Sequence, residues 1–592
     1  MDEREKIEST PVFQLYEKGK NYLRLTNHYD KVNQCLRFYK GDQWHNAQFG
    51  DVLKVQYNMI KPIVNYKTSS LDSYEYQIVY KPNNYATEEK QQRMEEICKM
   101  LNTHTAIIWE HKHMETVLRK VKKMGAIAGE DAIYFYFKKD KDKKTDNGEM
   151  IDDVMSGEFE AERINTTDIY YGNENDDKIE TQPYILIKQR KPLLEVQEEA
   201  RENGISEEEI DKIGTDRELA EEAGDAAQYE VEDNVLCVTK FYKKNGTVHC
   251  VKSTRSVIYQ KEMDLKLKRY PIAHFNWSDD VGSARGIGEV EYLIPNQIEV
   301  NKTLVRRVAI LTMIAYPKIV VNTDKIKNPA ALNKTGAVIE LSGGIDNINN
   351  YFGYVQPSQT SPEASALQSE LISMTRELAN ASDIATGAIN PEQASGKSIL
   401  AVQQASQQPL NEPLYRYKEL LEDIALIIFD IWRAYNVKGM NLYKQKEKED
   451  LSKIDDGVYE YQLEPITGQE LEELEPFITI EETPRTAYDR LAQEQSYENL
   501  LVKNMISFEE FVELLGEDST LDKHQLTKLV QKRQEKQRQI NEMQQQVQAQ
   551  ANDLQNEMQT EQMANQVETD VDINRINDNT EAQAQAMLEG VE

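Results

Sequence analysis

A glycine-rich turn followed by one long helical pattern constrains the fold of this 592-residue chain more than any other segment. The turn is Gly286-Ile287-Gly288, and the pattern after it predicts a helix over residues 286–316 that carries Glu291, Leu293, Gln297, Asn301, Arg306 and Arg307. Tyr316-Pro317 ends this helix, because proline cannot continue it. The turn lacks the third glycine of a dinucleotide-binding loop and follows no strand, so it predicts a flexible lead-in to the helix.

The region after this helix predicts a small β-rich module and a second helix. Residues 317–357 contain two strand-like runs, 317–322 and 337–341, with turns between them. Ser361 is a good N-cap and Pro362 fits the first helical position, so we expect a helix from Ser361 to about Asp383. The order is therefore helix, β module, helix.

A loop and a long helix come next. Residues 385–396 are rich in glycine, proline and asparagine and predict a loop. We expect a helix over 397–435 that is kinked by Pro409 and Pro413. Residues 440–482 are acidic and irregular, with strand-like pieces near 458–462 and 476–480.

The N-terminal half predicts a mixture of helices and strands. Residues 88–128 have apolar positions at helical spacing and predict one helix. The aromatic run 132–138 predicts a strand, and further strands are expected at 168–172, 183–189, 235–243, 247–253 and 256–261. Between them, the acidic insertion 196–232 predicts a solvated helical excursion. The fold class is therefore α+β and mainly helical.

The C-terminal part predicts short helices and then a long polar segment. Ser507 and Glu510 fit a capping box that starts a helix at Phe508. From 521 to 589 there is neither proline nor glycine, glutamine recurs, and apolar residues keep an approximate heptad. Two hypotheses remain open for this segment: a helix that joins copies of itself into a barrel, or a polar helix that frays. We expect helix to about residue 560 and disorder after it.

The composition limits the classes of function. The formal net charge is −32, which argues against a protein that wraps nucleic acid but not against one that lets DNA slide past. Solubility alone is an equally good explanation of this acidity. The four cysteines, Cys35, Cys98, Cys237 and Cys250, have no zinc-type spacing and are expected to be reduced and buried, with a Cys237–Cys250 disulfide disfavoured. The charged N-terminus and the absence of a long apolar run predict a protein with no signal peptide and no membrane span.

The sequence matches known catalytic and ligand-binding motifs only weakly. Ser395-Gly396-Lys397-Ser398 ends like a phosphate-binding loop, but Pro391 replaces the glycine that such a loop needs. His104, His111 and His113 lie close in sequence, which is more typical of a solvated helix surface than of a metal site. We therefore predict no catalytic residues, no metal and no cofactor, and hence a protein that is not an enzyme.

Three segments resemble the portal (head-to-tail connector) proteins of tailed bacteriophages. They are Phe38–Trp44 with Asn58–Asn65 near the N-terminus, the helix pattern of 286–301, and Met505–Gly516. The resemblance covers roughly residues 30–520. It implies a wing at 1–285, a stem helix at 286–316, a clip at 317–357, a second stem helix at 358–384, a tunnel loop at 385–396, a kinked wing helix with closing wing strands at 397–484, a crown at 485–524, and a C-terminal glutamine-rich helix or barrel at 525–592.

The resemblance also implies a mechanical function. Such proteins form a homo-oligomeric ring, typically of twelve subunits, at one capsid vertex. The ring nucleates capsid assembly with the major capsid and scaffolding proteins, docks the large subunit of the terminase, passes double-stranded DNA without regard to sequence, and binds neck or adaptor proteins. The expected location is the virion, with the host cytoplasm during assembly.

Candidate functional residues follow from this resemblance. The tunnel loop places Thr386, Gly387, Ala388, Ile389, Asn390, Pro391, Glu392 and Gln393 at the DNA channel, and because it carries no Lys or Arg we expect steric or weakly polar contact with DNA there. Candidates for the stem channel or for contacts between subunits are Lys302, Arg306, Arg307, Glu370 and Arg376. Lys302 and Arg306 share a helix face, and either line a channel or pair with Glu299 or Glu370 of a neighbouring subunit; we favour the second. Candidates in the clip for terminase or neck docking are Lys325, Lys327, Asn333 and Lys334.

Two other classes of function remain open. One is an enzyme in the α+β block, which would need a nucleotide or metal dependence that no motif supports. The other is a coiled-coil scaffold or adaptor of the virion without a DNA channel, assembled through the glutamine-rich tail.

Overall fold

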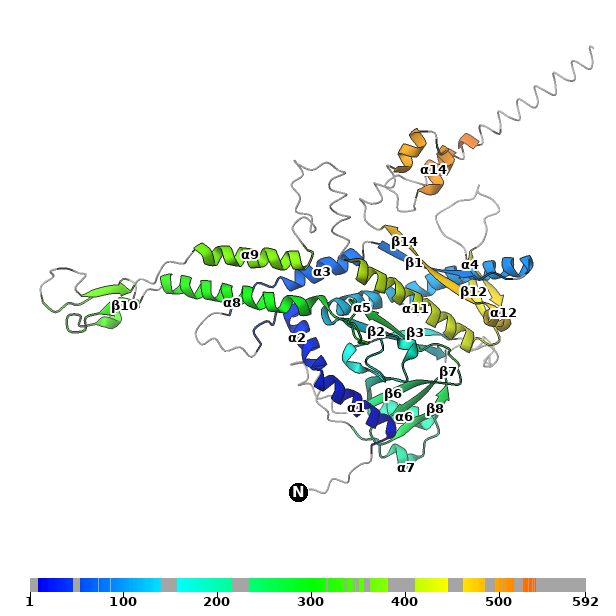
Figure 1. Cartoon of the computed structure of the whole chain (residues 1–592), viewed down its shortest axis with the longest axis horizontal. Helices are drawn as coiled ribbons and strands as arrows, with labels where there is room; N and C mark the ends of the chain where they lie inside the picture. The colour runs from blue at the N-terminus through cyan, green and yellow to red at the C-terminus, as the bar shows by residue number, and fades with distance from the viewer. Residues whose placement is uncertain are drawn as a thin grey trace, which may run out of the picture. The chain divides into compact units, whose positions relative to one another are not determined.

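The computed structural model describes most of the chain and divides it into two compact units, residues 1–483 and 484–592. The described residues are 9–45, 54–72, 74–85, 87–139, 157–215, 234–315, 318–334, 336, 338–343, 347, 351–355, 362–381, 410–445, 461–484, 496–503, 505–515, 525–530, 532–534, 536 and 538. Helices and antiparallel sheets are both present (Figure 1), so the predicted α+β class is confirmed.

A three-stranded antiparallel sheet lies at the centre of the larger unit. Its order is β3-β2-β9, with β2 at Glu130–Lys139, β3 at Gly157–Ile164 and β9 at Ile272–Asn276. The β-branched and aromatic run of β2 buries Ile133 and Phe135, which explains why the central strand forms here. The predicted strand at 132–138 is confirmed, whereas β3 and β9 were not predicted.

A five-stranded antiparallel meander contains the other predicted strands. Its order follows the chain: β4 (Ile169–Tyr171), β5 (Ile185–Pro192), β6 (Asn234–Lys244), β7 (Thr247–Ser253) and β8 (Ile258–Asp264). Asn245 and Gly246 both have positive φ and make the tight turn between β6 and β7. Cys237 and Cys250 lie on these two strands, out of register, and all four cysteines are free and buried, as predicted.

Helices cover these sheets. In the order of the chain they are α1 (Pro11–Leu25), α2 (His28–Lys40), α3 (Ile60–Leu71), α4 (Glu88–His111) and α5 (Met114–Ala128), with short 3₁₀ turns at Thr166–Asp168 and Ile179–Thr181. Phe13, Tyr16 and Leu23 of α1 form a small core with the five-stranded sheet. The helices α2 to α5 contribute to one large core that also includes the central sheet.

The single helix predicted over 88–128 is wrong, because the chain breaks it into α4 and α5. His113 adopts a left-handed conformation with φ of 51°. One residue of this kind reverses the local chain direction and ends the helical hydrogen bonds. The apolar spacing on either side is unaffected, so the break leaves no clear signal in the periodicity.

The acidic insertion is only partly what the sequence predicts. It begins with α6 (Leu193–Glu202) and α7 (Glu207–Ile210), so helices are present. Five of its apolar residues are buried against β6 and β8: Val196, Ala200, Ile205, Ile210 and Ile213. This part is therefore a packed layer and not a solvated excursion, while residues 216–233 lie outside the described residues.

A small β module joins the two long helices α8 (Glu289–Ala315) and α9 (Pro362–Leu378). It contains β10 (Lys318–Val321) paired with β11 (Phe352–Val355) and a 3₁₀ turn at Pro329–Asn333. The strand predicted at 317–322 is thus confirmed. The one predicted at 337–341 is wrong over its described residues 338–341, which make only an isolated bridge from Leu341 to Ile326.

The helix α11 (Asn411–Tyr435) runs through the large core and buries Trp432 completely. Pro413 is its third residue, where no backbone hydrogen bond is lost, so the predicted kink there is wrong. Pro409 lies outside the described residues. Near this helix, β12 (Met440–Gln445) pairs with β13 (Tyr461–Ile466), and β1 (Tyr74–Pro82) pairs with β14 (Pro476–Pro484). The short helix α12 (Gly468–Glu473) lies between β13 and β14.

The smaller unit contains α14 (Phe508–Leu514). Ser507 Oγ accepts from the Glu510 backbone N–H at 3.1 Å, and the Glu510 carboxylate accepts from the Ser507 N–H at 2.7 Å, which confirms the predicted capping box. Leu526 and Val530 pack against the core around Phe511. The glutamine-rich segment from residue 539 lies outside the described residues. No helix among the described residues is long and apolar enough to cross a membrane.

Candidate functional site

The helices α8 and α9 lie side by side and are the best candidate for a functional surface (Figure 1). Arg307 donates a hydrogen bond from Nη1 to Gln368 Oε1 and thereby links the two helices. Gln368 and Thr375 of α9 are buried. Leu371 and Ile372 of α9 are half-buried and pack on the large core, so one face of the helix is used within the chain.

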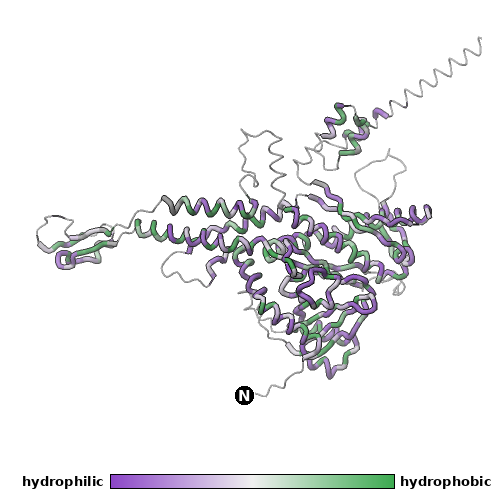
Figure 2. The backbone as a smooth tube through the Cα atoms, in the orientation of Figure 1, coloured by the Kyte–Doolittle hydropathy of each residue, from purple (hydrophilic) through white to green (hydrophobic). Residues whose placement is uncertain are grey.

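Burial changes along α8. Its first half buries Val290, Leu293, Ile294, Gln297, Val300 and Asn301, whereas residues 311–315 are all exposed. Figure 2 shows that hydrophobic residues nonetheless continue to the end of this helix. Leu311, Met313 and Ile314 are 54%, 59% and 40% exposed. Apolar side chains at this end of α8 are therefore not covered by the described part of the chain.

A stripe of exposed apolar residues runs along α9. Leu367, Met374 and Leu378 are 49%, 48% and 70% exposed, and their spacings of seven and four residues place them on one side of the helix. We call these three residues the α9 stripe. Contiguous exposed apolar surface of this kind is typical of an interaction site.

Two amide side chains hold the first half of α8. Gln297 Oε1 accepts from the Met59 backbone N–H at 2.9 Å, and its Nε2 donates to the Tyr57 carbonyl at 2.7 Å. Asn301 Oδ1 accepts from the Tyr57 N–H at 3.0 Å, and its Nδ2 donates to Gln43 Oε1 at 2.5 Å. Because Gln297 and Asn301 are almost fully buried, these bonds fix the helix against the segment before α3. We call this set the amide anchor.

Three glycines make the close approach that begins α8. A Cβ on Gly129 would lie 2.2 Å from the Gly286 carbonyl oxygen, and one on Gly288 would lie 2.7 Å from the Ile127 carbonyl oxygen. Gly129 also has φ of +104°, which favours glycine. The flexible lead-in predicted for Gly286 and Gly288 is therefore wrong, because these residues form a tightly packed backbone crossing.

A buried ionic network lies immediately before this crossing. Arg285 donates from Nη1 to Glu130 Oε1 at 2.6 Å, and from Nε and Nη2 to the carboxylate of Glu174 at 2.9 and 3.0 Å. His274 Nε2 lies 2.9 Å from Glu130 Oε2. Burial raises the pKa of the Glu130 carboxyl, but Arg285 and His274 outweigh it and hold that pKa well below its usual range.

His28 belongs to the same network. Its Nε2 lies 3.1 Å from Thr166 Oγ1 and 3.4 Å from Arg285 Nη1. Burial, together with the positive charge of Arg285, lowers the pKa of His28 to about 3. A neutral His28 ring can accept a hydrogen bond from Arg285. A protonated ring would instead place a second positive charge against Arg285. The network ties α2, β2 and β9 to the residue that precedes Gly286.

The predicted stem residues lie on α8 and α9 but do not form one cluster. Lys302 pairs with Glu299 of its own chain at 2.7 Å. Arg306 and Glu370 are exposed, Arg307 contacts Gln368, and Arg376 is half-buried.

The predicted residues of the β module are spread around it. Lys325 Nζ lies 5.2 Å from the centre of the Tyr351 ring, and Asn333 ends the 3₁₀ turn. Lys327 and Lys334 are exposed. The loop residues Thr386, Gly387, Ala388, Ile389, Asn390, Pro391, Glu392 and Gln393 lie outside the described residues, as do Ser395 and Ser398.

The residues that hold α8 were not predicted as a group. The segments around Gln43 and Met59 and the helix with Gln297 and Asn301 are each recognisable in the sequence, but nothing there connects them. The available signal was two amides spaced four apart on the buried side of an otherwise apolar helix. The solvated surface predicted for the histidine group is confirmed for His111 and His113, which are exposed, and wrong for His104, which is buried beside Trp432. Within the described residues, no group of three or more His, Cys, Asp and Glu side chains is arranged to hold a metal ion.

Comparison with models of protein families identifies the family of this chain. The family model described as phage P22-like portal protein matches residues 129–575, which is most of the chain and includes α8, the β module, α9 and α11. A search of curated proteins finds no match. The matched region thus contains the whole series of long helix, small β module, second helix and core helix. The chain belongs to the P22-like portal protein family of phages.

Proposed function

We propose that this portal protein acts as a homo-oligomeric ring, with twelve subunits, at one vertex of a phage capsid. The α9 stripe and the exposed end of α8 support this proposal, because a ring repeats one interface and covers the same surface on every copy. In this arrangement α8 and α9 are the stem and the module from β10 to β11 is the clip. The α+β part of the larger unit is the wing, residues 485–524 of the smaller unit are the crown, and residues 525–592 are a C-terminal helix or barrel.

The ring encloses a channel for double-stranded DNA during packaging and ejection. Exposed Arg306 on α8 either pairs with Glu370 of a neighbouring subunit, which we favour, or contacts the phosphate backbone, where contacts do not depend on sequence. Lys302 is also exposed, but it already pairs with Glu299. The net charge of −32 supports a wall that repels DNA and lets it slide, with a few basic side chains for guidance. Thr386–Gln393 provide the constriction through steric or weakly polar contact.

The β module is the docking site for the large terminase subunit and later for neck or adaptor proteins. Two observations support this role. Val320 and Val355, on the two paired strands, are 59% and 51% exposed, and Lys327 and Lys334 of the same module are exposed. A module that exposes both apolar and basic side chains suits a partner that binds and later leaves. The ring also nucleates capsid assembly with the major capsid and scaffolding proteins in the host cytoplasm, and remains in the virion.

Negative-stain electron microscopy of the purified full-length chain tests this function. We expect particles with a ring outline and a central hole. A second preparation that lacks residues 525–592 separates the portal from a tail-driven coiled-coil scaffold. Rings in both preparations support the portal, because the stem and the wing carry the assembly. Rings or oligomers that disappear with the tail support the scaffold. A full-length chain that forms only monomers or filaments would overturn the proposal.

A further inference from the structure

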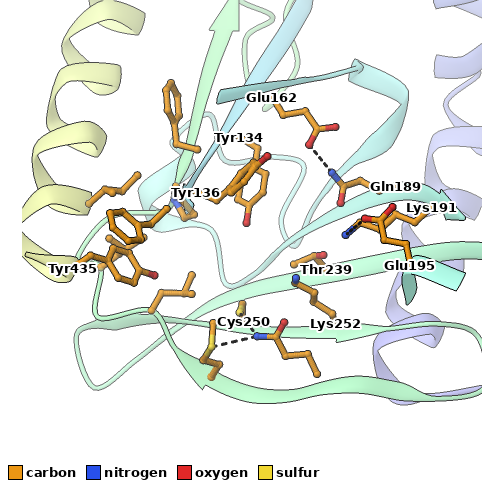
Figure 3. Close-up of a pocket in the computed structure, with 18 of the residues that line it drawn as sticks. Tyr134, Tyr136, Glu162, Gln189, Lys191, Glu195, Thr239, Cys250, Lys252 and Tyr435 are labelled. Carbon is orange, nitrogen blue, oxygen red and sulfur yellow. Dashed lines mark hydrogen bonds and ion pairs between the residues drawn. The ribbon is translucent and has the colours of Figure 1, made fainter. Parts of the chain in front are cut away.

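A cavity of about 560 Å³ lies between the three-stranded and five-stranded sheets (Figure 3). Its lining comes from β2, β5, β6, β7, β8 and the end of α11. This volume falls within the range of small-molecule sites in proteins. None of the residues proposed above for the ring, the channel or the docking site lines it.

Aromatic rings form one side of this cavity. Tyr134 and Tyr136 stack with ring centres 5.4 Å apart, and Phe137 stacks on Tyr435 at 4.7 Å with the planes 9° apart. Figure 3 shows Tyr134, Tyr136 and Tyr435 on one side, with Cys250 and Lys252 across from them. Aromatic faces and edges of this kind favour a planar aromatic partner.

Two buried polar side chains belong to the lining. Thr239 and Gln260 are only 6% and 7% exposed. Within the described part of the chain, the Gln260 amide donates only to the sulfurs of Cys250 and Met263 at 3.7 and 3.3 Å, and the Thr239 hydroxyl belongs to the same lining. Sulfur is a weak acceptor, and buried polar groups normally find stronger partners. A ligand with its own donor and acceptor would satisfy both side chains.

Both lysines of the lining are already paired, and Glu162 is hydrogen-bonded within the chain. Lys191 lies 3.2 Å from Glu199 and 3.6 Å from Glu195, and Lys252 also pairs with Glu199. Glu162 accepts a hydrogen bond from Gln189 at 3.0 Å. A charged ligand would have to break one of these pairs or be buried without a counter-ion, which is costly. The lining therefore favours an uncharged ligand.

We propose that this cavity is a binding site for an uncharged planar aromatic molecule that carries a hydrogen-bond donor and an acceptor. Thr239 and Gln260 bind its polar edge, and the rings of Tyr134 and Tyr435 contact its faces. The lining exists only in the folded chain, because β2, β7 and α11 all contribute to it. The ligand therefore binds the folded chain alone and stabilises it by mass action.

Titration calorimetry of the full-length chain with 4-hydroxybenzamide tests this site. We expect saturable binding in the millimolar range or tighter, as is usual for a ligand of this size. Cyclohexanecarboxamide keeps the amide without the aromatic ring, and benzoate adds a charge; both are expected to bind about tenfold more weakly. Equal binding of all three compounds, or no saturable binding of 4-hydroxybenzamide, would overturn the proposal.

Two substitutions place the binding in this cavity. Thr239→Val removes the hydroxyl at nearly constant shape and is expected to weaken binding by about threefold to tenfold. Met263 is 44% exposed, so Met263→Trp can fill the cavity without disturbing the core and is expected to abolish binding. Met505→Trp, at a 69% exposed methionine of the other unit, is the matched control and should bind normally. Binding that neither cavity substitution weakens would also overturn the proposal.

Discussion

The first half of α8 and the outer side of α9 belong to one pair of helices, yet their surroundings are opposite. The first half of α8 is enclosed: Gln297 and Asn301 have buried hydrogen-bond partners, and its start passes through a glycine crossing. The α9 stripe exposes three large apolar side chains. A single chain therefore completes the anchor of the pair but leaves its outer side uncovered. This difference separates what holds one subunit together from what is available to a neighbour.

The largest expected effect comes from breaking the glycine crossing. Gly129→Ala would place a methyl group 2.2 Å from the Gly286 carbonyl oxygen and keep an unfavourable positive φ. We expect the free energy of unfolding to fall by about 4 kcal/mol or more, because backbone must move. Urea denaturation measures this loss.

Gly204→Ala is the matched control for that substitution. Gly204 also has a positive φ, of +72°, but nothing lies within 4 Å of its added Cβ. The conformational strain alone predicts that the free energy of unfolding falls by about 1–2 kcal/mol. If both variants lose the same amount, the crossing is not tightly packed.

Breaking the amide anchor is expected to lower the free energy of unfolding by a smaller amount. Gln297→Leu keeps the apolar stem of the side chain but leaves the Met59 N–H and the Tyr57 carbonyl without their partner. We expect a loss of about 2–4 kcal/mol in the free energy of unfolding, measured in the same assay. Asn296→Ala, at the neighbouring half-buried position, should change it by only about 0.5 kcal/mol. Similar losses for the two variants would argue against an anchor.

The ionic network before the crossing predicts a dependence of stability on pH. His28 has a pKa of about 3 in the folded chain and 6.5 ordinarily, so between these values the unfolded chain binds the extra proton. The free energy of unfolding therefore falls as the pH decreases from 6.5 towards 3, by up to about 1.4 kcal/mol per pH unit from this group. The lowered pKa of Glu130 acts in the same direction at the acidic end.

His28→Asn is expected to reduce this slope when urea denaturation is repeated between pH 4.5 and 7. His111→Asn, at an exposed position on α4, is the control for loss of a histidine as such. A His28→Asn variant with the full slope would show that the burial of His28 does not govern the acid sensitivity.

The smallest effect on the fold is expected at the α9 stripe. Met374→Glu replaces a side chain that is 48% exposed and has no core role, so the free energy of unfolding of the separated chain should change by only about 0.5 kcal/mol. Thermal melting at protein concentrations too low for assembly checks this. A large loss would place Met374 in the core of the single chain and remove the contrast with the amide anchor.

Local patterns predicted local structure well. The aromatic run of β2, the apolar runs of β5 and β6 and the capping box at Ser507 each contain enough information within about ten residues. The α9 helix also followed from its proline and its apolar spacing. Each of these features depends on residues that are close together in the sequence, so the sequence pattern alone predicts it.

Long-range contacts were not predictable in the same way. Asn301 and Gln43 are 258 residues apart, and only the folded chain brings their amides together. The sequence predicted a flexible turn at Gly286 and nothing at Gly129, and only the fold shows that their backbones cross closely. The buried side of the acidic insertion was hidden because charge dominated its composition, although five apolar residues pack there. The order of segments predicted the family, while the atoms that hold α8 came only from the fold.

The most direct test of the account is the mass in solution of a variant with Leu367→Glu and Met374→Glu, compared with the unaltered chain. Val437→Glu, at a 66% exposed position after α11, is the matched control. Light scattering should give a ring for the unaltered chain and the control, and mainly folded single chains for the stripe variant, because buried carboxylates without partners oppose the interface. A stripe variant that assembles into the same ring would contradict the claim that the α9 stripe is covered by a neighbouring subunit.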